Sequence, residues 1–181
     1  MTRRIAIPDQ TPAASRPLLE AVHKQLGVVP NLMKVLSSSP AALGGYLNLN
    51  GALSKGVLGA KTGERIALAV AGINRCGYCL AAHTYLGKNV AKLDDAEISA
   101  NRNGTSSDAR ASAAVHFAVR IAQARGHVTD ADVQAVRRAG FGDAEIMEIV
   151  VHVALNTLTN YVNLVAQTEI DFPAVDLPLV A

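Results

Sequence analysis

Residues 76–83 read Cys-Gly-Tyr-Cys-Leu-Ala-Ala-His and hold the only two cysteines in a chain of 181 residues. Residues three and four positions apart lie on one face of an α-helix, so Cys76, Cys79 and His83 would form a continuous stripe there. The N-terminus of a helix carries partial positive charge and unpaired N–H groups, which stabilise a thiolate. The stretch therefore predicts a helix that begins at a redox-active cysteine pair, with an imidazole able to exchange a proton with it.

The same stretch has two other interpretations. The cysteines could be buried apolar side chains, with His83 as a hydrogen-bonded core histidine. Alternatively, Cys76, Cys79 and His83 could supply three zinc ligands in a structural oligomeric module, with His116 or His152 brought in by folding as the fourth. We favour the redox pair because chance is a poor explanation for this spacing when the chain has no other cysteine.

Outward from this stretch, cap and turn signals divide the chain into helices. A capping residue followed by proline predicts helix starts at Pro12 and Pro40, and Gly27 predicts a helix end. No segment shows the period-two alternation of a strand bounded by turns. The expected fold is all-α, compact, with the C-x-x-C at the N-terminus of a central helix. Residues 1–10 are expected to be extended, and the helices to span about 12–26, 30–36, 40–55, 61–73, 76–91, 94–102, 108–125, 129–139 and 143–169.

Composition narrows the class of protein. The chain is half hydrophobic and long enough to bury a core as one domain. Its formal net charge is only +2, with both signs mixed throughout, which argues against a nucleic-acid partner. The longest uncharged run, 149–168, contains several amides that would be costly in a membrane. We find no apolar segment typical of a secretory signal behind the basic start, and we expect a cytoplasmic protein.

The last predicted helix has an unusual polar stripe. Apolar residues cover most of its surface, and the polar remainder recurs at steps of three and four. These polar residues are Glu148, His152, Asn156, Asn160, Asn163 and Gln167. Amides in place of Lys and Glu suit a polar edge that is buried against a subunit partner or around a cavity, although a thin exposed edge fits equally well. The stripe makes His152 a possible second site histidine and favours a homo-oligomer.

Two segments together resemble a known family. Glu64 lies twelve residues before the C-x-x-C, and His83 lies four residues after it. This pattern resembles the alkylhydroperoxidase D-like (AhpD-like) branch of the carboxymuconolactone decarboxylase superfamily. The later segment 152–173, which begins His-Val-Ala-Leu-Asn, is similar to the peroxidase-related subgroup. The resemblance covers residues 40–173, so we expect a single AhpD-like domain with an N-terminal arm and helices over 1–39 and an irregular tail over 174–181.

The resemblance implies a function and a set of site residues. Members of this kind are thiol-dependent peroxidases that assemble as trimers or hexamers and use neither a cofactor nor a metal. Carried over, Cys79 would be the peroxidatic thiolate, Cys76 the resolving thiol, and His83 with Glu64 the proton relay. The partners implied are a hydroperoxide substrate and an external dithiol reductant. This chain departs from the family at Tyr78, where the best-known members have a second histidine, and a phenol does not shuttle protons near neutral pH.

Helix geometry supports Glu64 independently. The ten residues from Glu64 to Asn74 span about 15 Å, and the seven from Cys76 to His83 span about 10 Å. If the short link makes the two helices an antiparallel hairpin, Glu64 and His83 lie within about one turn of each other. A carboxylate there could orient the imidazole and raise its basicity. Otherwise Glu64 is a solvated glutamate in the first turn of a helix.

A lyase remains a further possibility. Other branches of the superfamily include decarboxylases that act on cyclic acids, and this chain could share that activity. The cysteine pair argues against it, because that chemistry does not need two thiols. Peroxide reduction with a redox-active disulfide is therefore the leading prediction.

Overall fold

The computed structural model describes residues 4–176, and these fold into helices with no strand among them. The all-α prediction is confirmed. Residues 1–3 of the expected arm and 177–181 of the expected tail lie outside the described residues. The elements are a 3₁₀ turn η1 (Ala13–Ser15) and the helices α1 (Arg16–Leu26), α2 (Asn31–Leu36), α3 (Pro40–Leu53), α4 (Ala60–Ile73), α5 (Gly77–Asn89), α6 (Asp95–Arg102), α7 (Ala109–Ala124), α8 (Asp130–Arg138) and α9 (Asp143–Ala166).

Side chains at the helix starts explain why these boundaries could be predicted. Asp94 and Asp108 cap α6 and α7, each accepting a hydrogen bond of 2.7 Å from a backbone N–H of the first turn. Thr129 and Asp132 form a capping box at the start of α8. Such caps satisfy N–H groups that the helix itself leaves unpaired, so each one fixes the residue at which a helix begins.

The last helix ends earlier than expected, at Ala166 rather than near Glu169. Gln167 takes a left-handed backbone conformation with φ 53°, and its N–H donates to the carbonyl of Asn163. The N–H of Thr168 donates to the same carbonyl at 3.1 Å. Left-handed residues commonly end helices, but glycine usually occupies the position, and Gln167 gave no such signal.

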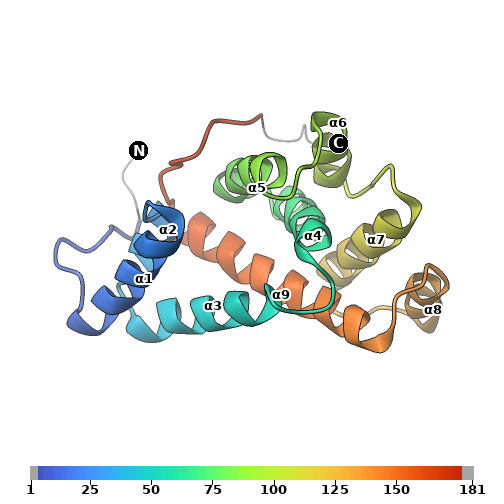
Figure 1. Ribbon diagram of the computed structural model, residues 1–181, viewed down its shortest axis with the longest axis horizontal. Coiled ribbons are helices and arrows are strands. Elements are labelled where there is room, and N and C mark those ends of the chain that lie inside the picture. Colours follow the sequence, from blue (N-terminus) through green and yellow to red (C-terminus); the bar gives the residue numbers. More distant parts are fainter. Residues whose placement is uncertain (1–3, 177–181) are drawn as a thin grey trace.

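The longest helix, α9, crosses the middle of the molecule and packs against α2, α3, α4, α5 and α7 (Figure 1). One apolar cluster fills the space between α4, α7 and α9 and includes Ile66, Phe117 and Ile149. A second cluster surrounds the start of α5 and includes Cys76 and Cys79. The cysteine pair therefore lies inside the core, beside the central helix.

The polar stripe of α9 faces inward. Asn156, Asn160 and Asn163 are 5%, 0% and 4% exposed, so the thin exposed edge is wrong for these three residues. Residues of the same chain, and not of a second subunit, bury these three asparagines. The solvent-facing side of α9 is apolar instead, and we call this surface the α9 apolar stripe. It consists of Met147, Val150, Leu158, Tyr161, Leu164 and Val165, which are 37–61% exposed.

By length and composition, α9 is the one helix in the described chain that could cross a membrane. Within this fold, 44% of its most apolar window is buried against the rest of the molecule. Its neighbours are the other helices of the domain. In this fold α9 is a core helix.

Candidate active site

The cysteine pair lies at a sharp reversal between α4 and α5. α4 ends at Ile73, and the link passes through Arg75, whose φ is 53°. The N–H of Cys76 then donates to the carbonyl of Ala71 at 3.0 Å, which closes the turn. The two helices pack against each other beyond it. The predicted hairpin is therefore present, and it brings the first turns of α4 alongside the second turn of α5.

Both cysteine sulfurs meet at the first turn of α5. Cys76 is the N-cap residue, and its Sγ accepts a hydrogen bond from the N–H of Cys79 at 3.4 Å. The two Sγ atoms are 2.6 Å apart, and both thiols are free. The side chains are nearly inaccessible, with Cys76 1% and Cys79 2% exposed. Only a small group, or a substrate admitted by a local movement, can reach either sulfur.

The surroundings make the two thiols unequal. The pKa of Cys79 is lowered to about 7, chiefly because the Cys76 thiol donates a hydrogen bond to its sulfur. Burial opposes this shift, while the charge of His83 supports it. The hydrogen bond from Asn163 and the nearby amide of Asn160 lower the pKa further. The pKa of Cys76 is raised, because it is the donor to Cys79 and because it is buried. Cys79 is thus the thiol that ionises near neutral pH.

His83 and Glu64 form the expected contact. Nδ1 of His83 lies 2.9 Å from Oε2 of Glu64, and the two side chains are 20% and 21% exposed. Burial alone would lower the pKa of His83, but the Glu64 carboxylate and the nearby Cys79 sulfur outweigh it and raise the pKa. The carboxylate therefore favours imidazolium, and imidazolium favours thiolate at Cys79. The structure brings all four predicted site residues together.

Tyr78, which lies directly before Cys79, has a structural environment. Its hydroxyl accepts a hydrogen bond from the N–H of Leu32 at 3.1 Å. Its ring packs edge-on against Phe172, with 5.7 Å between ring centroids. Burial is the main reason why its pKa is raised. Tyr78 therefore joins α5 to α2 and to the segment after α9, and its phenol stays protonated at neutral pH.

Tyr46 on α3 is a site residue that the sequence did not reveal. Its ring packs against the cluster that contains both cysteines. Burial first, and then the charges of Glu64 and Cys79, raise its pKa to about 12. Its hydroxyl consequently keeps its proton at neutral pH. Tyr46 lies far from the C-x-x-C in sequence, and no motif or periodicity on α3 distinguishes it from its neighbours.

Two asparagines of α9, Asn160 and Asn163, also reach the site. Nδ2 of Asn163 donates to Sγ of Cys79 at 3.3 Å. Oδ1 of Asn160 accepts a hydrogen bond of 2.9 Å from Nδ2 of Asn74, in the link between α4 and α5. Nδ2 of Asn156 donates to the carbonyl of His152 at 2.8 Å, within α9 itself. Sequence spacing indicated that these amides share a face, but it could not say that the face meets Cys79.

The other two histidines considered from sequence lie in different places. The ring of His152 lies over Gly63, where a Cβ would be 2.9 Å from Cε1 of the ring, and burial lowers its pKa. Glu64 and His83 lie near enough to influence that pKa, so His152 borders the relay pair. His116 is exposed on α7. Among the residues that the structure describes, no three His, Cys, Asp or Glu side chains are grouped to hold a metal ion.

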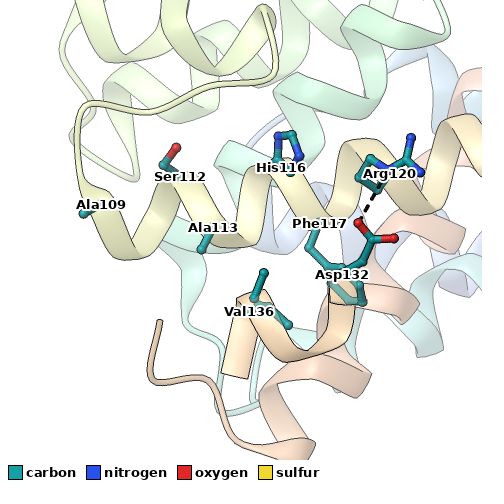
Figure 2. Close-up of a pocket in the computed structure, with 9 residues that line it drawn as sticks. Ala109, Ser112, Ala113, His116, Phe117, Arg120, Asp132 and Val136 are labelled. Carbon is teal, nitrogen blue, oxygen red and sulfur yellow. Dashed lines mark ion pairs between the residues drawn. The ribbon is translucent and has the colours of Figure 1, made fainter. Parts of the chain in front are cut away.

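One pocket lies beside the cysteines, and a second lies elsewhere on the molecule. A pocket of about 260 Å³ opens beside the cysteines, and the segment after α9 forms part of its wall. It is lined by Cys76, Gly77, Tyr78, Asn163, Leu164, Gln167, Thr168 and Ile170. A larger pocket of about 490 Å³ lies between α7 and α8 (Figure 2) and is lined in part by His116, Arg120 and Asp132. None of the predicted site residues lines this larger pocket.

The fold is similar to those of several solved structures. A peroxidase-related protein from Silicibacter sp. TM1040 is 25% identical over 91% of this chain and 88% of its own, with a TM-score of 0.79. A peroxidase-related protein from Ralstonia eutropha JMP134, described as an alkylhydroperoxidase AhpD core, is 24% identical over 93% of this chain and 92% of its own, with a TM-score of 0.84. Debrominase Bmp8, in complex with 2,3,4-tribromopyrrole, is 16% identical over 94% of this chain and 92% of its own, with a TM-score of 0.76.

Sequence comparison agrees with the fold. None of the curated proteins compared with the chain matches it. Residues 40–124, which include α4, α5 and all four predicted site residues, match the carboxymuconolactone decarboxylase family. The similarity to AhpD-core structures extends over nearly the whole chain. Residues 40–124 are therefore similar to the carboxymuconolactone decarboxylase family, and the chain has an all-helical fold similar to that of an AhpD core.

Proposed function

We propose that this protein is a thiol-dependent peroxidase that reduces hydroperoxides through a dithiol–disulfide cycle of Cys76 and Cys79, in antioxidant defence. The observation that carries the proposal is the pair of free thiols 2.6 Å apart at the start of α5, where the pKa of Cys79 is lowered to about 7. A thiol with a pKa near ambient pH combines a large ionised fraction with good nucleophilicity. The names of the similar proteins from Silicibacter and Ralstonia favour the same reaction.

The cycle has three balanced steps. The Cys79 thiolate attacks the terminal oxygen of a hydroperoxide, the O–O bond breaks, and an alkoxide leaves while Cys79 becomes a sulfenic acid. The Cys76 thiol then displaces water from this sulfenic acid and forms the disulfide. An external dithiol reduces the disulfide and is itself oxidised, which restores both thiols.

His83 and Glu64 supply the proton that the leaving group needs in the first step. As imidazolium, His83 stabilises the Cys79 thiolate and can then protonate the departing alkoxide, which needs a proton to leave as an alcohol. The Glu64 carboxylate, 2.9 Å from Nδ1 of His83, stabilises the charged ring and fixes its orientation. Tyr78 has no part in this relay, so His83 supplies its only imidazole.

The proposal includes an assembly and a location. We propose a homotrimer or homohexamer, because the α9 apolar stripe leaves six large apolar side chains 37–61% exposed on one helix. We also propose a cytoplasmic location, where a free dithiol pair persists in the reduced state.

One experiment tests the reaction directly. Free thiols are counted in the reduced protein before and after one equivalent of a hydroperoxide, intact mass is recorded, and metal content is determined on the same sample. The proposal expects loss of both thiols to an intramolecular disulfide and stoichiometric formation of the alcohol. Thiols that survive peroxide would contradict it. In that case, bound stoichiometric zinc would support a structural module, whereas turnover of a cyclic acid with both thiols intact would support a lyase.

A further inference from the structure

Asn163 and Asn160 make an unusual contribution to the cysteine site. They belong to α9, whereas the cysteines, His83 and Glu64 belong to α4 and α5 or the link between them. Nδ2 of Asn163 donates to Sγ of Cys79 at 3.3 Å, and the side chain of Asn160 also favours the Cys79 thiolate. The two residues lie on the same face of α9, three positions apart. Both are almost completely buried: Asn160 is 0% exposed and Asn163 is 4% exposed.

Each of these amides also leaves one polar atom unpaired. Oδ1 of Asn160 accepts from Asn74, but its Nδ2 has no hydrogen-bond partner within the described chain. Nδ2 of Asn163 donates to Cys79, but its Oδ1 has none there. Buried polar atoms are normally satisfied by protein, water or ligand, so a vacant donor and a vacant acceptor next to one sulfur indicate a bound group that supplies both partners.

The group that fits has one acceptor and one donor on a single small atom. A hydroxyl meets this requirement, because its oxygen accepts one hydrogen bond and its O–H donates another. Resting on the proposed peroxidase function, we propose that Asn160 and Asn163 form a hydroxyl-binding site at Cys79. The site holds the terminal –OH of the hydroperoxide during attack and the –OH of the sulfenic acid that results.

This assignment follows the atoms of the reaction. The transferred oxygen keeps its own proton: the O–O bond breaks, an S–O bond forms, and the –OH passes from the hydroperoxide to Cys79. The oxygen can accept from Nδ2 of Asn160 before and after transfer, while the O–H donates to Oδ1 of Asn163. The alkoxide that leaves is on the other oxygen and takes its proton from His83. The amides therefore bind the –OH group that is common to all hydroperoxides. They make no contact with the remainder of the substrate.

The position of Asn163 provides access for such a group. Besides contacting Cys79, Asn163 lines the pocket of about 260 Å³ that also contains Cys76, Tyr78 and Thr168. The sulfur of Cys79 is itself 2% exposed, so only the terminal end of a substrate held in that pocket can approach it. Alkyl hydroperoxides suit this geometry, since a one-atom polar head is followed by a chain that can remain in the pocket or outside it.

The test uses leucine substitutions, which keep size and remove the amide. Asn163→Leu, Asn160→Leu and the matched control Asn156→Leu are made in the full-length protein; Asn156 lies on the same buried stripe but bonds within α9. The rate of the first oxidation of Cys79 by an alkyl hydroperoxide is measured by stopped flow, at a pH where Cys79 is fully ionised in each protein. Alkylation by iodoacetamide at the same pH reports the thiolate alone, because this reagent carries no hydroxyl to bind.

We expect Asn160→Leu to slow peroxide oxidation by about 10²-fold, the usual cost of one lost hydrogen-bond donor at a reacting oxygen. Asn163→Leu removes the acceptor of the substrate O–H and should slow the same oxidation. Alkylation should be equal in all four proteins, and Asn156→Leu should oxidise at the native rate. Asn163→Ala removes the same amide without adding bulk, and it replaces the leucine variant if that variant does not fold. Equal slowing of peroxide and iodoacetamide, or no slowing of peroxide, overturns the hydroxyl-binding site. If the native protein is not oxidised by peroxide, the proposed function itself fails, and the native control shows this separately.

Discussion

At the scale of single residues, Cys79 is activated from three sides. Cys76 donates a hydrogen bond along α5, His83 supplies positive charge one turn away, and Asn163 donates from α9. Each of these groups interacts better with the thiolate than with the thiol, so each lowers the pKa of Cys79. Burial acts in the opposite direction. Removing any one partner should therefore raise the pKa and leave the others in place.

The contribution of Glu64 can be measured by Glu64→Gln. This change keeps the shape of the side chain and removes the charge that favours imidazolium at His83. We expect the apparent pKa of Cys79 to rise and peroxide reduction near neutral pH to slow by about 10²-fold, a typical general acid–base contribution. Peroxidase assays and a thiol titration of the reduced protein would measure the two effects, and a thermal melt should show nearly unchanged stability.

The control for this variant is Glu20→Gln, an exposed glutamate on α1. It removes the same charge from the same chain without touching the site, so rate and thiol pKa should stay at native values. If Glu64→Gln also reacted like the native protein, the relay would be wrong, although the cysteine cycle could still operate.

The two cysteines should respond differently to substitution. Cys79→Ser should abolish peroxide consumption, because no thiolate remains to attack. Cys76→Ser should still allow one oxidation and should end in a sulfenic acid or a mixed disulfide, since no resolving thiol is present. Mass spectrometry after one equivalent of peroxide, with a sulfenic-acid trap, distinguishes these products. The opposite pattern, with the first oxidation lost only in the Cys76 variant, would reverse the roles.

The pH dependence of the first oxidation should follow ionisation of Cys79. The thiolate is the reactive form and its fraction increases with pH, so the rate should rise to a plateau with a midpoint near the pKa of about 7. Cys76→Ala removes the largest stabilising hydrogen bond and should move the midpoint to higher pH. Rates of a single turnover, measured from acidic to alkaline pH in both proteins, would show the shift. A midpoint that stays in place would mean that Cys76 does not set the pKa.

Which site residues the sequence could reveal depends on their distance along the chain. Glu64 and His83 lie on two helices with a three-residue link, so helix rise alone places them within about a turn of each other. Their contact at 2.9 Å confirms that argument. Asn163 reaches the Cys79 sulfur from α9, and Tyr46 packs into the surrounding cluster from α3. Only the packing of helices distant in sequence brings them there. Spacing within one segment contains no information about that packing.

At the scale of elements, Glu97 joins α6 to α4 and to the loop after α6. Its carboxylate accepts hydrogen bonds from Arg65 at 2.9 Å, from Ser106 at 2.5 Å and from the Ser107 hydroxyl at 2.7 Å. It also accepts from the N–H of Ser107 and from Asn101, at 3.0 Å each. Burial opposes ionisation, but these donors lower the pKa of Glu97 to about 2. A carboxylate held in this way connects three segments through one charge.

Glu97→Gln should therefore destabilise the fold by about 2 kcal/mol or more at neutral pH, because it leaves Arg65, whose side chain is only 12% exposed, without its ion pair. The pKa is lowered in the folded state, so the stabilisation is fully present above the ordinary pKa of 4.5 and is lost as pH falls towards about 2. Urea denaturation of both proteins, repeated across that range, should show the difference shrinking with acid. Asp95→Asn is the control on the same helix: its ion pair with Lys88 is exposed and should contribute less than about 1 kcal/mol.

The helix α9 shows what the sequence of a single helix cannot predict. The sequence correctly placed its amides on one stripe, because helical periodicity fixes which residues share a face. Periodicity does not determine which face turns inward, and apolar residues lie on both the buried and the exposed sides of this helix. The amides are buried because they meet polar partners, Cys79 for Asn163 and Asn74 for Asn160. The exposed apolar side is the consequence.

At the scale of the whole molecule, the segment after α9 connects distant parts of the fold. Oδ2 of Asp171 accepts a hydrogen bond of 2.7 Å from the N–H of Asn31, the first residue of α2. The ring of Phe172 lies 5.7 Å from that of Tyr78 and 6.0 Å from that of Tyr85, both on α5. The chain thus passes from the end of α9 across α2 and α5 (Figure 1). There it lines one side of the cysteine pocket. The sequence indicated only an irregular segment here, because the contacts that place it, those of Asp171 and Phe172, are with residues far away in the chain.

The α9 apolar stripe is the basis of the last prediction. Six large apolar side chains on one exposed helix face form a continuous surface that water contacts unfavourably, and a second copy of the chain would cover it. Native protein at micromolar concentration should sediment as a trimer or hexamer of the 18.9 kDa chain. Leu158→Glu places a charge in the middle of the stripe and should shift the protein to monomers without unfolding it, because the side chain is already 41% exposed. Leu26→Glu, at a 52% exposed apolar residue on α1, should leave the assembly intact. A native protein that sediments only at 18.9 kDa would contradict the assembly, and dissociation by Leu26→Glu but not by Leu158→Glu would place the interface elsewhere.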